Sequence, residues 1–73
     1  MGLASNSAFM NRLEALRAKY RNLWDSHQLL ADQNARLVHA GKSPTNEQLI
    51  NEQRAAEAVQ LARRELLAAM EGA

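Results

Sequence analysis

The sequence predicts an all-α protein that folds as an antiparallel two-helix hairpin with coiled-coil-like packing. Three observations support this fold class. Mostly apolar and aromatic residues in the first half recur on an unbroken 4-3-4-3 spacing, which is typical of a long helix packed against another helix. One short break, which holds the only proline, divides the chain. The second half is rich in alanine and other good helix formers. Residues 1–73 therefore form one domain of two helices and a turn.

The first predicted helix covers about residues 6–40. Ser5 or Asn6 is suited to cap its first turn, and no glycine or proline occurs between residues 7 and 40. Gly41 supplies the left-handed conformation that commonly ends a helix. Such a helix is roughly 50 Å long. The residues on the regular spacing, here called the seam, are Phe9, Leu13, Leu16, Tyr20, Leu23, His27, Leu30, Asn34 and Leu37.

The predicted turn covers residues 41–45, and the second helix runs from about residue 44 to about residue 71. Ser43 suits the N-cap and Pro44 the first helical position, because proline has no amide hydrogen that needs a partner there. Glu47 lies where its charge favours the helix dipole, and Gly72 follows the helix. A turn this short requires the two helices to lie antiparallel.

Apolar residues of both helices form the predicted hairpin core. On a helical projection, one face of the second helix gathers Leu49, Ala55, Ala56, Val59, Ala62, Leu66, Leu67 and Met70. The alanines on that face allow the first helix to approach closely. The side chains assigned to the hairpin core are Phe9, Leu13, Leu16, Tyr20, Leu23, Leu30, Leu37, Leu49, Ala56, Val59, Leu66 and Met70.

Two paired helices leave some apolar residues of this sequence uncovered. These residues lie beside the seam on the first helix or on the far side of the second helix. An exposed apolar strip of this kind marks an interaction site or promotes aggregation. The partner-binding candidates are Met10, Trp24, Ala31, Val38, Ile50 and Leu61. Trp24 leads among them, because aromatic residues are enriched at the centres of binding interfaces.

The small size of the chain also indicates a protein partner. A domain this short buries only roughly 60% of the surface that its unfolded chain exposes, so it is marginally stable alone. The chain has no cysteine for a disulfide or a thiolate metal site. His27 and His39 are too far apart in sequence to form a metal site on one helical face. We expect no metal and no cofactor.

Two polar residues occupy the seam, and each has two interpretations. His27 is either a pH-sensitive packing switch or a histidine at the edge of the seam that bonds a neighbour or water. Asn34 either fixes the register of the helices or faces solvent or the turn backbone. The less functional interpretation is favoured for both.

Several classes of function are disfavoured by the sequence. The carboxylates are scattered along the helices, and no catalytic triad or phosphate-binding loop is visible, so we expect no enzyme. A formal net charge of +1 gives little reason to expect nucleic acid, and the basic residues between 12 and 21 spread around the helix. No apolar run reaches the roughly 20 residues that span a bilayer, and no signal peptide is visible. The expected compartment is the cytoplasm.

Four stretches of the sequence carry a family resemblance. They are Leu29-Leu30-Ala31-Asp32-Gln33-Asn34, Gly41-Lys42-Ser43-Pro44, Asn46-Glu47-Gln48-Leu49-Ile50-Asn51-Glu52-Gln53 and Ala55-Ala56-Glu57-Ala58-Val59. In this order they resemble the needle-subunit co-chaperones of bacterial type III secretion systems, which are small cytoplasmic helical hairpins. The resemblance implies two protein partners, a larger chaperone built from helical repeats and the needle subunit. Its implied role is to help keep that subunit monomeric before export.

Three other hypotheses remain open. The hairpin is alternatively a self-associating structural or adaptor module, in which two copies form a four-helix bundle, and a co-chaperone without its partner can form the same homodimer. A third hypothesis is the needle subunit itself, which is also a small hairpin, although the single Pro44 and the close of the second helix at Glu71-Gly72-Ala73 argue against it. A fourth, which the balanced charge disfavours, is a DNA-binding protein.

Overall fold

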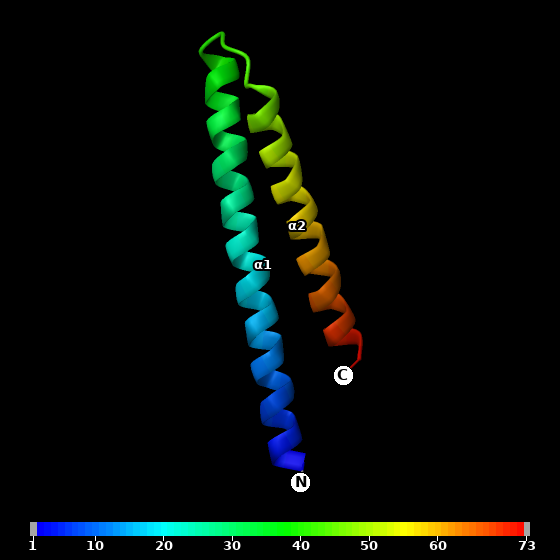
Figure 1. Ribbon diagram of the computed structural model, residues 1–73. Helices are drawn as coiled ribbons and strands as arrows, with labels where there is room; N and C mark the ends of the chain where they lie inside the picture. The colour runs from blue at the N-terminus through cyan, green and yellow to red at the C-terminus, as the bar shows by residue number, and fades with distance from the viewer. Residues whose placement is uncertain (1, 73) are drawn as a thin grey trace.

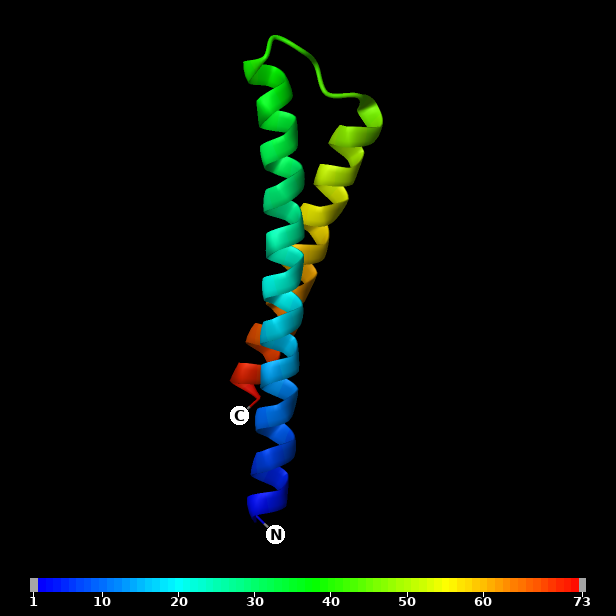
Figure 2. The same cartoon turned by 90° about the vertical axis from the view of Figure 1, so that its left-hand side faces the viewer.

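The computed structural model describes residues 2–72, with side chains from residue 7 onward, and it contains two helices. α1 comprises Gly2–His39 and α2 comprises Asn46–Glu71. The helices run antiparallel and are joined by one turn (Figure 1), in a molecule of 61 × 15 × 14 Å. α2 crosses α1 at a shallow inclination, so it lies on one side of α1 near the turn and on the other side near its C-terminal end (Figure 2). The predicted all-α hairpin is confirmed.

α1 begins earlier than the sequence predicted. The helix starts at Gly2, so Ser5 and Asn6 lie inside it and the prediction that one of them caps it is wrong. No proline interrupts residues 2–8, and the helix therefore continues through these positions. Its N-terminal end extends past the C-terminal end of α2 (Figure 1).

The end of α1 follows the prediction for Gly41. This glycine has a φ of 75°, in the left-handed region. Its amide donates to the Val38 carbonyl at 3.0 Å, and the Lys42 amide donates to the Leu37 carbonyl at 2.8 Å. These are the two hydrogen bonds of a Schellman motif, and they satisfy carbonyl groups that the helix end leaves free.

The N-cap of α2 is Thr45, and not Ser43 as predicted. The Thr45 hydroxyl accepts a hydrogen bond from the Gln48 amide at 3.1 Å, and the Gln48 side chain accepts one from the Thr45 amide at 2.8 Å. This reciprocal capping box satisfies two amide groups, whereas a cap at Ser43 satisfies one. Pro44 therefore precedes the helix, and Glu47 lies in the first turn as expected.

The seam of α1 is the buried face of that helix. All nine seam residues are buried or half-buried, and between residues 7 and 40 only Ala31 shares that state. The corresponding buried positions of α2 also follow a heptad spacing, and we call them the α2 seam. They are Glu52, Ala55, Val59, Ala62, Leu66 and Ala69, and two further half-buried residues of α2, Ala56 and Ala58, lie beside this spacing. The hairpin is thus held by two matched seams, as in a coiled coil.

Two residues assigned to the core lie outside it. Leu49 and Met70 are nearly half exposed, and Leu67 of the predicted face is exposed too. The buried face of α2 is rotated from the predicted one, because the small side chains of Ala55, Ala62 and Ala69 allow α1 to lie directly over them. Val59 is buried as predicted, whereas Ala56 is half-buried beside the α2 seam.

The core is thin. The apolar side chains buried to 9% exposure or less, among residues 7–72, are Leu13, Val59, Ala62 and Leu66. No large side chain in that range is fully enclosed. A core of this size provides limited stability, as expected for a domain of this length.

Asn34 joins the two helices through a polar contact inside the seam. It is 7% exposed, and its Nδ2 donates to Glu52 Oε1 at 2.7 Å and to the Gln48 carbonyl at 3.3 Å. The interpretation in which Asn34 faces solvent or the turn backbone is therefore wrong. Both acceptors belong to α2, and sliding one helix along the other would remove them. Asn34 thus fixes register within the hairpin.

Charge contributes little to the pairing of the helices. The only ion pair among the described side chains joins Lys19 to Glu65 at 3.3 Å, and the two side chains are 54% and 49% exposed. Exposed pairs of this kind contribute about 0–1 kcal/mol.

His27 is half-buried, its Nδ1 is enclosed without a hydrogen-bond partner, and its ring lies 6.3 Å from that of Trp24.

Candidate interaction surface

The hairpin has two long edges, one on each side of the paired seams. Lys19 directly precedes a seam residue of α1, and Glu65 directly precedes a residue of the α2 seam. Their ion pair therefore shows that residues directly before a seam position, on either helix, lie along the same edge of the hairpin. We call this edge the polar edge. Residues that directly follow Leu16, Leu23 and the equivalent seam positions must then line the opposite edge.

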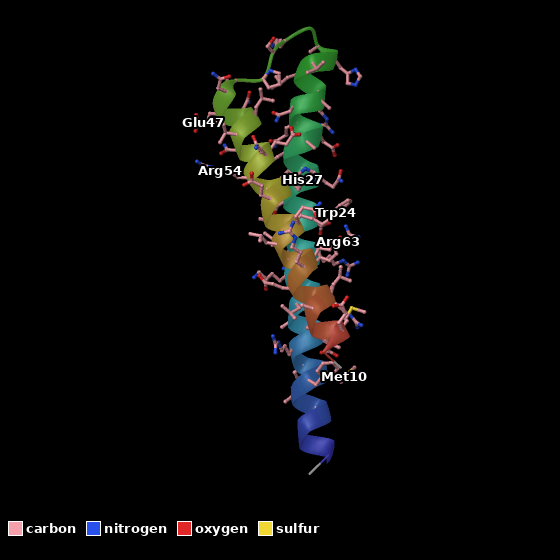
Figure 3. All side chains as sticks on the ribbon, turned by 90° about the vertical axis from the view of Figure 1, so that its right-hand side faces the viewer. Met10, Trp24, His27, Glu47, Arg54 and Arg63 are labelled. Atoms are coloured by element: carbon pink, nitrogen blue, oxygen red, sulfur yellow. The ribbon has the colours of Figure 1, made fainter. Side chains whose placement is uncertain are left out.

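That opposite edge, here called the apolar edge, consists of two rows of side chains. The α1 row comprises Met10, Arg17, Trp24, Ala31 and Val38. The α2 row comprises Leu49, Ala56, Arg63 and Met70. Figure 3 shows Met10, Trp24 and Arg63 along one side of the hairpin, with Glu47 and Arg54 along the other.

The large apolar side chains of this edge are open to solvent. Met10, Trp24, Val38, Leu49 and Met70 are each between 46% and 62% exposed. The smaller Ala31 and Ala56 are half-buried between them. Seven of the nine positions in the two rows are apolar. A continuous apolar strip on both helices is a feature of surfaces that contact another protein.

The structure brings together four of the six predicted partner-binding residues. Met10, Trp24, Ala31 and Val38 form the α1 row. Ile50 and Leu61 are exposed, but at 100° per residue they point away from α1, on the outer face of α2 and toward the polar edge. They do not join the apolar edge.

The sequence interpretation missed three residues of this surface. Leu49, Ala56 and Met70 belong to the α2 row, although they were assigned to the core. The heptad spacing of residues 52, 55, 59, 62, 66 and 69 identifies the α2 seam. Positions 49, 56 and 70 lie beside this seam and not on it. This spacing was obscured because a glutamate and three alanines occupy the seam.

A shallow hollow of about 350 Å³ opens in the apolar edge. Its lining is mostly apolar and consists of Arg17, Tyr20, Arg21 and Trp24. Tyr20 is half-buried in the seam, whereas the other three side chains are exposed. The hollow therefore combines two aromatic rings with two guanidinium groups.

The polar edge differs in composition. The residues that precede the seam positions on α1 include Arg12, Lys19, Ser26 and Gln33, and those on α2 are Asn51, Arg54, Ala58, Leu61, Glu65 and Ala68. The exposed Leu29 lies on this side of α1, where it has polar neighbours. This edge presents no apolar row.

Metal-binding clusters and helices fit to span a membrane are absent from residues 2–72. No group of three or more histidine, cysteine, aspartate or glutamate side chains in that range is arranged to hold a metal ion. Neither described helix has a stretch that is both long and apolar enough to cross a membrane. The apolar edge is the candidate site that stands out in the described part of the chain. Comparison with protein-family models, curated proteins and solved structures finds no match to this chain.

Proposed function

We propose that this chain is a non-enzymatic cytoplasmic co-chaperone that binds another protein through its apolar edge. The observation that supports this most strongly is the pair of apolar rows on one side of the hairpin. Helix pairing does not require these rows, since the seams already provide the contact between α1 and α2. A partner that covers the rows removes their apolar surface from water. This burial stabilises the complex by about 25 cal/mol for each Å² of apolar surface.

The proposed partners follow from the family resemblance of the sequence. A larger chaperone built from helical repeats would cover the apolar edge, and the two proteins together would hold a type III secretion needle subunit in monomeric form. In this role the hairpin acts by binding alone and has no turnover. The hairpin has a thin core, so it also gains stability from the complex. Any partner that binds only the folded form raises the free energy of unfolding.

Coexpression with the products of neighbouring genes tests this proposal. The tagged hairpin should copurify with a helical-repeat protein and with a small helical subunit. Trp24→Asp should abolish the copurification, because it places a charge in the middle of the apolar edge. Leu29→Asp is the matched control, since Leu29 is also exposed but lies on the other side of α1. Equal loss with both variants, or no partner at all, contradicts the proposal.

The alternative function, a self-associating module, uses the same edge. Analytical sedimentation distinguishes it from the co-chaperone. In that alternative, two hairpins cover each other's apolar edges and form a four-helix bundle. A concentration-dependent dimer that Trp24→Asp dissociates, and that Leu29→Asp leaves intact, would support the alternative. A monomer at high concentration would remove it.

A further inference from the structure

One arginine interrupts each row of the apolar edge, at nearly the same level along the hairpin. Arg17 is the exception in the α1 row, and Arg63 is the exception in the α2 row. Lys19 lies opposite Glu65, so an antiparallel register places Arg63 close to the level of Arg21 and within about one helical turn of Arg17. Two otherwise apolar rows thus carry their positive charge in one place.

The charge in this place is not neutralised within the described part of the chain. Arg17, Arg21 and Arg63 are exposed, and none of them forms an ion pair among side chains 7–72. The positions on the outer side of the two rows are Glu14, Arg21, Gln28, Ala35, Gln53, Gln60 and Leu67. Glu14 is the acidic residue closest in sequence to Arg17, and the two line one hollow. Glu57 lies farther along the hairpin, where it lines another hollow with Ala56.

We propose that the apolar edge binds an acidic amphipathic helix, which lies between the two rows and completes a three-helix bundle. This inference deepens the proposed function and rests on it, since it specifies the chemistry of the partner segment. The apolar stripe of that helix covers Met10, Trp24, Val38, Leu49 and Met70. Its carboxylates lie at the level of the three arginines, whose guanidinium groups bind carboxylates with paired hydrogen bonds.

The hollow beside Trp24 supports this arrangement. It is lined by Arg17, Tyr20, Arg21 and Trp24, so one side chain that enters it meets aromatic rings and two guanidinium groups together. A carboxylate on an aliphatic stem matches both kinds of lining. Aromatic and arginine side chains are also the two types that contribute most often to binding hot spots.

The dimensions of the edge set the length of the partner helix. The α1 row extends from Met10 to Val38, which corresponds to about 42 Å of helix. A partner helix of four heptads, roughly 28 residues, covers that length.

A second copy of this chain is a poorer occupant of the edge. Two-fold pairing would bring the edge against itself, because the same surface is used by both copies. The arginine clusters alone would then bring six arginines and two glutamates to the interface, counting Arg17, Arg21, Arg63 and Glu14 from each copy. An acidic helix offers the opposite charge, so charge complementarity favours a different partner.

Two synthetic peptides serve as probes of the partner's charge. Each has four heptads with leucine at both seam positions, no tryptophan, and either glutamate or lysine at all flanking positions. Like charges at the flanking positions keep each peptide from pairing with itself. Trp24 is the only tryptophan of the chain, so its fluorescence reports binding at the apolar edge.

The acidic peptide should bind the full chain at least roughly fivefold more tightly than the basic peptide at low salt, and added salt should reduce the difference. R17Q/R21Q/R63Q should remove this preference. R12Q/R36Q/R54Q is the matched control and should retain it, because its arginines lie outside the apolar edge. Both variants change the formal net charge from +1 to −2, and circular dichroism verifies that both stay helical.

The possible results separate the inference from the proposed function. If both peptides bind equally well, the acidic partner is excluded, although the edge still binds helices. If both triple variants lose the preference equally, the effect is one of net charge and the inference fails. If neither peptide alters Trp24 fluorescence, the edge does not accept a helix, and the proposed function fails too. If the protein alone shows the fluorescence change on dimerising, the second copy is the occupant and the inference is overturned.

Discussion

The two edges of the hairpin flank the same paired seams, yet they have different compositions. The apolar edge has two rows that are apolar except for Arg17 and Arg63, whereas the polar edge holds Arg12, the Lys19–Glu65 ion pair, uncharged polar residues and scattered apolar ones such as Leu29. Packing of α1 on α2 is satisfied by the seams and demands neither composition. The seams account for the folding of the hairpin, and the asymmetry between the edges supports the proposed binding role of the apolar edge.

The largest expected effect comes from breaking the seam on which both edges depend. Leu66→Ala removes one of the few buried apolar side chains and should lower the free energy of unfolding by about 2–4 kcal/mol. Leu61→Ala, at an exposed position of the same helix, should change it by less than about 0.5 kcal/mol. Urea unfolding followed by circular dichroism measures both. Equal losses would mean that the α2 seam is misplaced.

A smaller effect is expected from the residue that aligns the two edges. Asn34→Ala leaves the half-buried Glu52 carboxylate without its 2.7 Å donor and should destabilise the hairpin by about 1–2 kcal/mol. Gln33→Ala, at the exposed neighbouring position, is the control. Zero-length carbodiimide coupling of the Lys19 amine to the Glu65 carboxylate, which lie 3.3 Å apart, reports the register, and this coupling should be slower after Asn34→Ala. An unchanged rate would show that Asn34 does not fix the register.

The smallest effect is expected on the polar edge. Lys19→Gln removes an exposed ion pair and should lower the free energy of unfolding by less than about 0.5 kcal/mol, with the difference vanishing at high salt. Binding of the acidic peptide should not weaken, because Lys19 lies outside the apolar edge. A loss of binding as large as that of R17Q/R21Q/R63Q would erase the distinction between the edges.

The α1 seam was predictable from sequence, and the surface of α2 was not. In α1, large apolar residues mark nearly every seam position, so the 4-3-4-3 spacing stands out against polar neighbours. In α2 the seam runs through Glu52, Ala55 and Ala69, whereas larger apolar residues such as Leu49 and Met70 lie beside it. A helical projection that follows the largest apolar side chains therefore predicted a buried face of α2 that is rotated from the observed one.

The helix ends show a similar division. Gly41 was identified correctly, because a glycine after a long uninterrupted helix has one common role. The start of α2 was not, because Ser43 and Pro44 form a good capping pair by themselves. The competing signal is Thr45 followed three positions later by Gln48, whose two hydrogen bonds provide a stronger cap.

The central claim, that the apolar edge is the binding surface, is tested most directly by methyl NMR spectra of the full chain titrated with the acidic peptide. The methyl signals of Met10, Val38, Leu49 and Met70 should shift together as the peptide binds. The side chains of Leu29, Ile50 and Leu61 are about as exposed in the free protein, but their methyl signals should not shift. Shifts confined to this second group would show that the hairpin binds through a different face and would contradict the claim.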